Sequence, residues 1–511
     1  MDKYIIAYDL GTGGNKASLY DLNGKCIAEN FASYETLYPQ SGFHEQRPED
    51  WWQAIVASTR ELLEQSKIAP EQIQCCGISG HSLGVVPLDK DQNLLCQATP
   101  IWSDSRPTAA QTAPFFEKID EEKWYSITGN GFPPALYSIF KILWYKDNMP
   151  QMFEKISKVI GTKDYINFKL TGVVATDYSY ASGSGVYDLQ NWCYSDELIE
   201  ASGIDAEILP EIVASTKVLG TLTEQAALEL GLTQNVKVVA GGVDNSCMAL
   251  GAKAFKEGRC YNSLGSSSWI AISSHSPLID VDARPYVFAH VVPEMFASAT
   301  AIFSAGSSFK WVKQQLCSEF AQQADQTGDD VYDLLCQAAQ NSPVGAKGLI
   351  FNPSLAGGSC LDASPNIRGA FIGLDLGHTK DDVVRATLEG IALGLKVAVN
   401  KLGALCEISD EMIAVGGGSQ NEHWRQIFAD AYKMKIVKTS VDQQAAALGA
   451  AALAAVGAGL WGNFDIIDKI HEVHSVTSPA CDSMKVYDKM LPIYEKAGAY
   501  LSELGDDIAA L

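Results

Sequence analysis

Short apolar runs that end at glycines recur along this chain and predict β-strands followed by tight turns. Residues 5–9 form such a run with an acid at its end, residues 11–14 are rich in glycine, and residues 16–20 form the next run. Two short strands joined by a tight turn are typical of a β-hairpin. Similar runs predict further strands at residues 74–79, 85–89, 100–103, 236–240, 260–264, 268–273, 412–415 and 435–439.

Apolar residues spaced three or four apart predict helices between these strands. The clearest examples are residues 48–66, with a proline at the first position, residues 153–171, and residues 381–402, which Gly403 is expected to end. Residues 445–462 are mainly alanine and glycine. We interpret this run as a buried helix rather than a membrane span, since small residues gain little free energy on entering lipid. The alternation of strands and helices predicts an α/β protein.

The architecture of the first half is predicted to recur in the second. The hairpin with its glycine-rich turn at residues 11–14 has a counterpart at residues 265–268, without a repeat of fixed period. A chain of 511 residues is also too long for one ordinary core. We therefore predict an N-terminal domain over residues 1–240 and a C-terminal domain over residues 241–465, with the tail 466–511 as a candidate for returning to the first domain.

Composition and charge narrow the classes of partner. The chain carries 47% hydrophobic and 19% charged residues with a net charge of −23, which argues against nucleic acid or an anionic membrane as the main partner. An acidic protein can still hold a nucleotide through backbone N–H groups and a divalent cation. The twelve cysteines form no CxxC pair, the eight histidines form no cluster at metal spacing, and the first residues lead straight into a strand. We therefore expect reduced thiols, no structural metal, no signal peptide and a cytoplasmic location.

Three glycine-rich segments follow predicted strands, at residues 9–14, 265–268 and 416–421. Glycines let backbone N–H groups approach a phosphate, and the hydroxyls in these segments add donors. Any one of them alone is also compatible with a plain tight turn. Their coincidence, together with Asp244 after a further strand, favours an enzyme that removes a proton from a substrate hydroxyl while holding a nucleotide. No GxxxxGK[ST] segment is present, so a P-loop is not indicated.

Six segments carry a resemblance to a known family. They are residues 9–14 (DxGT), 44–52 (EQxPxxWW), 101–106 (WxDxR), 138–144 (part of a first signature), 369–389 (a second signature) and 416–426 (GGGSxN followed by WRQ). Together, and over essentially the whole chain, they resemble the FGGY family of carbohydrate kinases, and its xylulokinase-like members in particular. The resemblance implies two actin/Hsp70-like (ribonuclease H-like) domains, with mixed sheets flanked by helices, closing on a central cleft. It also implies ATP and Mg²⁺ as cofactors, a small sugar or polyol as substrate, and a homodimer as an option.

The resemblance also implies roles for individual residues, with the sugar assigned to the N-terminal domain and the nucleotide to the C-terminal domain. Asp244 falls where the family has its catalytic base, and Asp9 and Asp244 are expected to hold Mg²⁺ through water. The residues expected at ATP and its phosphates are Gly11, Thr12, Gly13, Asn15, Lys16, Gly265, Ser266, Ser267, Gly306, Gly417, Gly418 and Asn421. The residues expected at the substrate are His81, Ser82, Trp102, Asp104, Arg106, Asp244 and Asn245.

Two departures from the family pattern affect the substrate. His81-Ser82-Leu83 stands where xylulokinase-like members usually carry Gln-Met-His, and Gly357-Gly358-Ser359 replaces a common GER. The prediction is therefore an ATP-dependent kinase for a terminal sugar hydroxyl, with a ketopentose such as D-xylulose as the best guess. Other ketoses, tetritols, glycerol, gluconate and a signalling polyol remain as alternatives. A nucleotide switch of the actin/Hsp70 type, without a sugar substrate, is the alternative from another class.

Several of these residues also have plain structural interpretations. Asp104 and Arg106 are compatible with a salt-bridged turn, and His81 with a core histidine bonded to backbone. Asn421 is compatible with the cap of a helix, and so is Asp244.

Overall fold

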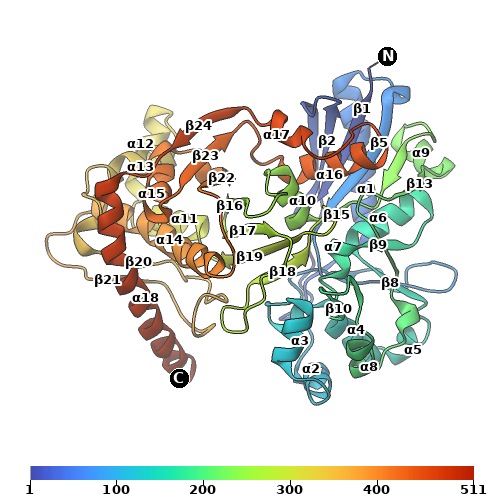
Figure 1. Ribbon diagram of the computed structural model, residues 1–511, viewed down its shortest axis with the longest axis horizontal. Helices are drawn as coiled ribbons and strands as arrows, with labels where there is room; N and C mark the ends of the chain where they lie inside the picture. The colour runs from blue at the N-terminus through green and yellow to red at the C-terminus, as the bar shows by residue number, and fades with distance from the viewer. Residues whose placement is uncertain (1) are drawn as a thin grey trace. The chain divides into compact units, whose positions relative to one another are not determined.

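Figure 1 shows the computed structural model, which describes residues 2–511. Contacts divide the chain into two compact units, each assembled from three stretches of sequence. Unit 1 holds the residues up to Glu257 together with Ser273–Ala297 and Gln444–His471. Unit 2 holds Gly258–Ile272, Ser298–Gln443 and Glu472–Leu511. Both units are mixed sheets flanked by helices, as predicted.

The main sheet of unit 1 has the strand order β13-β14-β5-β1-β2-β3, and β15 also pairs with β5. The strands of this unit are β1 (Tyr4–Leu10), β2 (Gly14–Asp21), β3 (Cys26–Ser33), β4 (Glu45–Gln46), β5 (Ile73–Gly80), β6 (Val86–Leu88), β7 (Thr99–Pro100), β8 (Lys158–Ile160), β9 (Ala175–Asp177), β10 (Tyr187–Asp188), β11 (Cys193–Tyr194), β12 (Glu211–Val213), β13 (Val218–Thr221), β14 (Lys237–Val239), β15 (Gly242–Val243) and β18 (Tyr286–Ala289). Strand β1 runs antiparallel to β2 and parallel to β5, which places the ends of β1 and β5 at one edge of the sheet.

Helices cover both faces of this sheet. Those of unit 1 are α1 (Pro48–Ser66), α2 (Ala109–Phe116), α3 (Glu121–Thr128), α4 (Ser138–Asn148), α5 (Pro150–Phe153), α6 (Thr162–Thr171), α7 (Tyr178–Ala181), α8 (Asp196–Ser202), α9 (Glu224–Leu230), α10 (Asp244–Gly251), α16 (Ala445–Gly457) and α17 (Ile466–Ile470). Side chains alternate along a strand, so Ile6, Tyr8 and Leu10 share one core with Trp51 of α1. On the other face α16 packs so closely on β5 that a Cβ added at Gly77 would lie 2.5 Å from a helix carbonyl oxygen.

Unit 2 repeats this plan. Its sheet runs β19-β17-β16-β22-β23-β24, with β16 antiparallel to β17 and parallel to β22. The strands are β16 (Cys260–Leu264), β17 (Ser268–Ser274), β19 (Phe296–Ile302), β20 (Ile350–Asn352), β21 (Ala370–Ile372), β22 (Glu411–Val415), β23 (Lys435–Thr439) and β24 (Val473–Thr477). The helices are α11 (Gly306–Gln315), α12 (Ser318–Thr327), α13 (Val331–Ala339), α14 (Lys380–Gly403), α15 (Glu422–Tyr432) and α18 (Cys481–Ala509).

The division into units differs from the predicted boundary at residues 240 and 241. Residues 241–257 stay in unit 1, since α10 packs along α16 beside the first sheet. The end of the chain also differs from the prediction, because residues 472–511 join unit 2. There β24 pairs with β23, and α18 packs on α14 and α15. It is the preceding stretch, Gln444–His471, that returns to unit 1.

Two of the predicted helices have different outcomes. The predicted single helix over residues 153–171 is wrong, because residues 158–160 form β8 and pair with β6. A cross-strand partner outside the local segment overrides the helical spacing there. The alanine-rich run is a buried helix, α16, as predicted. Among residues 2–511, no helix has both the length and the apolarity needed to span a membrane.

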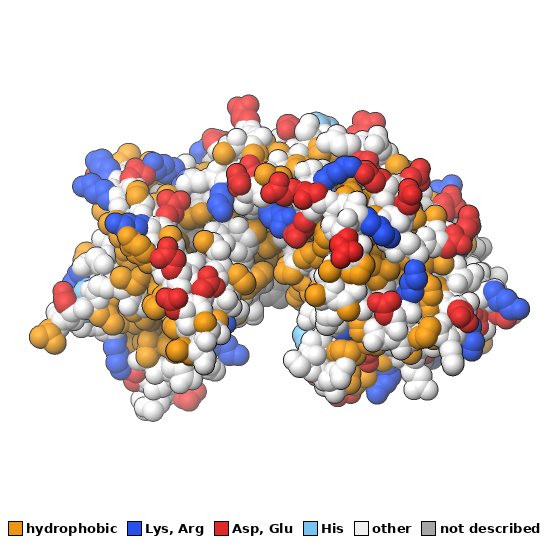
Figure 2. Space-filling model, turned by 90° about the horizontal axis from the view of Figure 1, so that it is seen from below, with side chains coloured by type: hydrophobic (Ala, Val, Ile, Leu, Met, Phe, Trp, Pro, Cys, Tyr) orange, Lys and Arg blue, Asp and Glu red, His pale blue; other side chains and the backbone are white. Residues whose placement is uncertain are grey.

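Charged side chains are mixed over the surface. On the face drawn in Figure 2, carboxylates alternate with lysine and arginine side chains, and basic groups do not form a continuous field there. A continuous basic field is what a phosphate backbone requires. This face therefore offers no support for nucleic acid as a partner.

Candidate active site

Three strands of unit 1 end side by side at one edge of the sheet, and each end carries a predicted site residue. Asp9 of β1 and Gly242 of β15 both pair in register with Ser79 of β5. Two residues after Gly242 the chain enters α10, and Asp244 is the first residue of that helix. Parallel strands that end together bring residues far apart in sequence to one place. The structure thus brings Asp9 and Asp244 to the same edge.

The turn that delivers Asp244 depends on Gly241. Its φ of +70° lies in the left-handed region, and a Cβ there would lie 2.1 Å from the carbonyl oxygen of Ile78. Only glycine tolerates both the conformation and the contact. The strand-to-helix junction is therefore fixed by sequence at this residue.

Asp244 is electrostatically unusual. Its side chain is half-buried, and one carboxylate oxygen accepts a hydrogen bond from the backbone N–H of Asn245 at 2.7 Å. Burial, with a further contribution from the negative charge of Asp9, raises the pKa of Asp244 to about 7. A carboxylate that exchanges its proton near neutral pH has the property that a general base needs. Asn245 lies beside it in the first turn of α10.

Asp9 is held from two sides. Its carboxylate accepts a hydrogen bond from the Ser79 hydroxyl at 3.1 Å, and Lys16 lies opposite it in the β1–β2 pair. Burial raises the pKa of Asp9, while the Ser79 hydrogen bond and the charge of Lys16 oppose that rise. Two carboxylates at one edge offer the oxygen ligands that Mg²⁺ prefers, and a cation between them would offset their mutual repulsion. The side chains present therefore fit a magnesium ion.

The turn at residues 11–14, here called the Thr12 turn, connects β1 to β2. The hydroxyl of Thr12 accepts a hydrogen bond from the indole N–H of Trp102 at 2.9 Å, and the Thr12 carbonyl accepts one from Gln46 at 2.7 Å. The Gly11 carbonyl accepts a hydrogen bond from the Tyr34 hydroxyl. A Cβ added at Gly13 would meet nothing within 4 Å, so this part of the turn is open to a ligand.

Asn15 does not belong to the open part of this turn. Its side chain is buried, and its amide donates to the hydroxyl of Ser58 in α1 at 2.9 Å. The alternation of β2 directs residue 15 into the core, away from the face that carries Lys16. The side chain of Asn15 is therefore not available to a phosphate at the turn.

The segment at residues 80–84, here called the His81 loop, follows β5. His81 is only 1% exposed, and its ring packs edge-on against Trp51 with 5.8 Å between ring centroids. Burial lowers the pKa of His81 to about 3, so the ring is neutral. Among residues 2–511 neither ring nitrogen has a hydrogen-bond partner, which is rare for buried polar atoms. Ser82, next to it, is half-buried.

Asp104 and Arg106 bond to each other. The Arg106 guanidinium donates to the Asp104 carboxylate at 2.8 and 2.9 Å and to Glu45 at 2.6 Å. Asp104 also accepts the backbone N–H of His44 at 2.8 Å, and both members of the pair are buried. This geometry is the salt-bridged turn that was the alternative for these residues. Of the three residues in this segment that were expected at the substrate, Trp102 is the accessible one, with 39% of its surface exposed.

Lys141 supports this region and was not among the predicted site residues. It is fully buried in α4, and its ammonium group donates to the carbonyl oxygens of Leu83 at 3.0 Å and Ile101 at 2.8 Å. It thus ties the His81 loop to the segment that carries Trp102. Burial lowers the pKa of Lys141 to about 7. A lysine within the apolar run 138–144 was the signal in the sequence.

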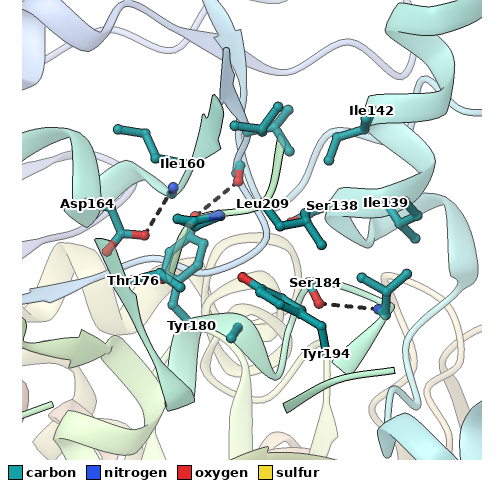
Figure 3. A pocket seen from close by; sticks show the side chains of 17 residues that line it. Ser138, Ile139, Ile142, Ile160, Asp164, Thr176, Tyr180, Ser184, Tyr194 and Leu209 are labelled. Atoms are coloured by element: carbon teal, nitrogen blue, oxygen red, sulfur yellow. Dashed lines mark hydrogen bonds between the residues drawn. The ribbon is translucent and has the colours of Figure 1, made fainter. Parts of the chain in front are cut away.

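A small cavity lies behind the His81 loop. It is lined by Gly84, by apolar side chains of α4 and by Tyr180, whose hydroxyl donates to the Gly84 carbonyl at 3.1 Å (Figure 3). Its volume of ≈ 30 Å³ is enough for one or two water molecules but not for a sugar. The cavity therefore belongs to the support of the loop.

Unit 2 carries the other glycine-rich segments. The turn at residues 265–267, here called the Gly265 loop, joins β16 to β17, and Gly265 and Ser266 are exposed. The backbone N–H groups of Ala305 and Ser307 each donate to the Ser266 carbonyl at 3.0 Å. A Cβ at Gly306 would lie 2.5 Å from the Gly265 carbonyl oxygen, so the loop rests on the first turn of α11. A helix N-terminus beside an exposed hydroxyl turn is a suitable environment for phosphate oxygens.

The segment at residues 416–420, here called the Gly417 loop, touches the same strand end. Gly416 has a φ of +90°, and a Cβ there would lie 2.8 Å from the Leu264 carbonyl oxygen. Gly417 is exposed, and a Cβ there would meet nothing within 4 Å. The loops that begin at residues 265 and 416 are thus brought together within unit 2, with open backbone at both.

Asn421 caps a helix. Its side-chain oxygen accepts hydrogen bonds from the backbone N–H groups of His423 and Trp424 at 3.0 and 3.3 Å, and its side-chain amide group donates one to Asp333 at 2.7 Å. The cap was the alternative for this residue, and it fixes the start of α15. Arg425, which the prediction did not include, donates to the carbonyls of residues 419 and 420, both at 2.7 Å. It holds the Gly417 loop from behind.

Comparison with known proteins identifies the class. Residues 4–251 match the N-terminal domain, and residues 260–458 the C-terminal domain, of the FGGY family of carbohydrate kinases. The chain belongs to this family and is an ATP-dependent carbohydrate kinase. The predicted family and fold class are confirmed.

Individual relatives narrow the position within the family. The chain is 30% identical to the xylulose kinase of Bacillus subtilis (strain 168), over 98% of each chain. It is 28% identical to the gluconokinase of the same organism, over 97% of this chain and 95% of that one. The crystal structure of ligand-bound xylulose kinase from Lactobacillus acidophilus superposes with a TM-score of 0.88 at 28% identity, over 97% of each chain. The chain is xylulokinase-like, and its similarity to a gluconokinase leaves the sugar to be assigned.

Proposed function

We propose that the protein transfers the γ-phosphoryl group of ATP to a terminal hydroxyl of a neutral ketopentose, with D-xylulose as the best candidate. The observation that carries the proposal is the environment of Asp244. This carboxylate is half-buried beside Asp9 at a sheet edge, and its pKa is raised to about 7. Such a group can accept a proton at neutral pH and release it afterwards.

In the proposed reaction Asp244 accepts the proton of the sugar hydroxyl as its oxygen attacks the γ-phosphorus. The bond from that phosphorus to the bridging oxygen breaks, and ADP leaves. Phosphoryl transfer of this kind requires mainly positioning and charge neutralisation. Helix α10 and the glycine turn before it supply the positioning of the base.

Within unit 2 we assign the nucleotide to the open backbone of the Gly265 and Gly417 loops. Within unit 1 we assign the Thr12 turn to phosphate oxygens. Exposed glycines and a serine hydroxyl beside the start of α11 support this assignment. Asp9 and Asp244 would hold Mg²⁺ through water, and the ion when bound neutralises phosphate charge. These assignments extend to Ser266, Ser267 and Gly418 as contacts of the nucleotide.

The charges around the His81 loop favour a neutral sugar over a sugar acid. Arg106 pairs with Asp104 and Glu45. Lys141 donates to two carbonyls, and Lys163 of α6 pairs with two buried carboxylates. A carboxylate substrate such as gluconate binds best to a cation that is free to pair with it. These three cations are already engaged.

A coupled ADP-release assay tests the proposal across D-xylulose, other ketoses, a tetritol, glycerol and gluconate at matched concentrations. We expect kcat/KM for D-xylulose to exceed that for gluconate by about tenfold or more. Gluconate as the best substrate would overturn the choice of a neutral sugar. Slow ATP hydrolysis without stimulation by any sugar or polyol would overturn the kinase mechanism and favour a nucleotide switch.

A further inference from the structure

The strand that delivers Asp244 is short and has little support of its own. Strand β15 consists of Gly242 and Val243, and within residues 2–511 its strand partner is the end of β5. The backbone N–H of Val243, directly before Asp244, instead donates to the hydroxyl of Ser179 at 2.9 Å. A side chain from α7 therefore holds the backbone at the junction.

Ser179 is itself held by a buried ionic network. Its hydroxyl donates to Asp177 at 2.5 Å, and the same carboxylate oxygen accepts from the Ser215 hydroxyl at 2.8 Å. The other oxygen of Asp177 pairs with Lys163 at 2.9 Å, and Lys163 also pairs with Asp164 at 2.5 Å. We call these five residues the Lys163 network. All of them are buried.

The direction of each hydrogen bond follows from this chemistry. The carboxylate of Asp177 pairs with the ammonium group of Lys163 and only accepts hydrogen bonds, so the Ser179 hydroxyl must point its hydrogen at Asp177. Its lone pairs are then left for the N–H of Val243. A hydroxyl polarised by a carboxylate is also a stronger acceptor, because hydrogen bonds in a chain reinforce one another.

The same network supports the His81 loop. Thr162, next to Lys163 in the first turn of α6, donates from its hydroxyl to the His81 carbonyl at 2.7 Å. A Cβ added at Gly80 would lie 2.8 Å from the Cβ of Lys163, so this glycine rests directly on the lysine stem. One helix turn thus contacts both the loop after β5 and the side chains that hold β15.

We propose that Ser179, oriented by Asp177 of the Lys163 network, is a positioning residue that sets the place of Asp244 relative to the His81 loop. The proposal rests on Asp244 being the general base. Ser179 itself contacts neither sugar nor nucleotide in this account. It acts through the Val243 N–H, and its loss lets the junction relax while the fold persists.

Ser179→Ala tests this, with Ser215→Ala as the matched control. Both changes remove one buried hydroxyl donor from the same oxygen of Asp177, but only the first removes the acceptor for Val243. We expect kcat to fall about tenfold or more in Ser179→Ala and to stay within about twofold in Ser215→Ala, since small displacements of a reacting group are costly. Both variants should lower Tm by a similar few degrees and leave the KM for ATP unchanged.

The split between kcat and KM separates positioning from general weakening, because a displaced base should lower kcat in Ser179→Ala only, while the KM for ATP stays unchanged in both variants. Ser179→Cys keeps the approximate size of the side chain but accepts hydrogen bonds weakly, so its kcat should lie between those of Ser179→Ala and Ser215→Ala. This variant serves as the test if Ser179→Ala does not fold. Equal kcat for the alanine variants at 179 and 215 would overturn the inference. Absence of sugar-stimulated ADP release in the wild-type protein would instead overturn the proposed function.

Discussion

The two units hold their candidate ligands by different means. At the sheet edge of unit 1 the chemistry lies in ionisable side chains, and Asp244 is braced by partners far away in sequence. In unit 2 the exposed groups at the strand ends are mostly backbone and small hydroxyls, in the Gly265 and Gly417 loops. Charged groups there, such as Arg425, lie behind the loop.

The difference follows from the tasks that we assign to the units. Proton removal needs a carboxylate with a shifted pKa, and that shift depends on burial, which only packing can create. Phosphate binding needs backbone N–H groups in a turn that side chains do not obstruct. Glycines supply such a turn from the local sequence alone. Changes around Asp244 and the His81 loop should therefore alter turnover and sugar use, and changes in the Gly265 and Gly417 loops should alter nucleotide use.

Asp244→Asn should give the largest effect. We expect kcat to fall about a thousandfold while the sugar still binds, because the amide cannot accept the proton. Steady-state kinetics and a sugar-binding titration check this. Asp362→Asn, at another carboxylate whose pKa burial raises but which lies in unit 2, is the matched control and should keep normal turnover. Near-normal kcat for Asp244→Asn would remove this residue from the mechanism.

Lys141→Met should give the second-largest effect. It leaves the buried carbonyls of Leu83 and Ile101 without their donor, so the His81 loop and the Trp102 segment lose their common tie. We expect kcat/KM for the sugar to fall by about tenfold to a hundredfold, with the KM for ATP unchanged. Lys146→Met, on the same helix but bonded to a carbonyl at residue 203, is the control. A rise confined to the KM for ATP would contradict the division of tasks.

Gly417→Val tests unit 2. A Cβ at this position would meet nothing within 4 Å, so the fold should persist, but the new side chain occupies the space from which a nucleotide would approach the loop. We expect the KM for ATP to rise about tenfold, which equals the loss of one good contact. The KM for the sugar should not change. Gly462→Val, at another glycine with open space, should be silent, and an equal effect there would discount the assignment.

The dependence on pH should be the mildest effect. The pKa of Asp244 is about 7, and the base must be ionised, so kcat/KM should be half-maximal near pH 7 and fall below it. The folded state binds this proton more tightly than the unfolded state does. The stability that protonated Asp244 contributes is therefore lost progressively as the pH rises from about 4 to 7, and the full loss persists above pH 7. Asp244→Asn should therefore raise Tm, more at pH 8 than at pH 5. A Tm difference that is constant with pH would argue against the shifted pKa.

The sequence was most informative where function depends on local backbone. The glycine turns at residues 11–14, 265–267 and 416–420 lie where short strands end, as predicted, since glycine and strand signals are both local. Helix α14 was also predictable from its long regular spacing. The position of Asp244 beyond a strand followed from the apolar run before it. These features require no knowledge of distant partners.

Side-chain partners were harder to predict. Whether Asp104 and Arg106 bind a ligand or each other depends on Glu45 and on two aromatic rings from other segments. Asn15 is a buried support because α1 covers it. Lys141 and Lys163 look unremarkable in their helices, and their burial against carbonyls and carboxylates arises only in the folded chain. Such partners are set by tertiary packing, which periodicity does not report.

The contact between α10 and α16 has a consequence for dissecting the molecule. A Cβ at Gly251 would lie 1.8 Å from a carbonyl oxygen of α16, and one at Gly449 would lie 2.0 Å from a carbonyl oxygen of α10. The helix that carries the base thus fits a surface encoded almost two hundred residues later. A fragment ending at residue 257 would leave that surface bare, whereas a permuted chain that appends residues 444–471 to it would restore the missing half of the joint.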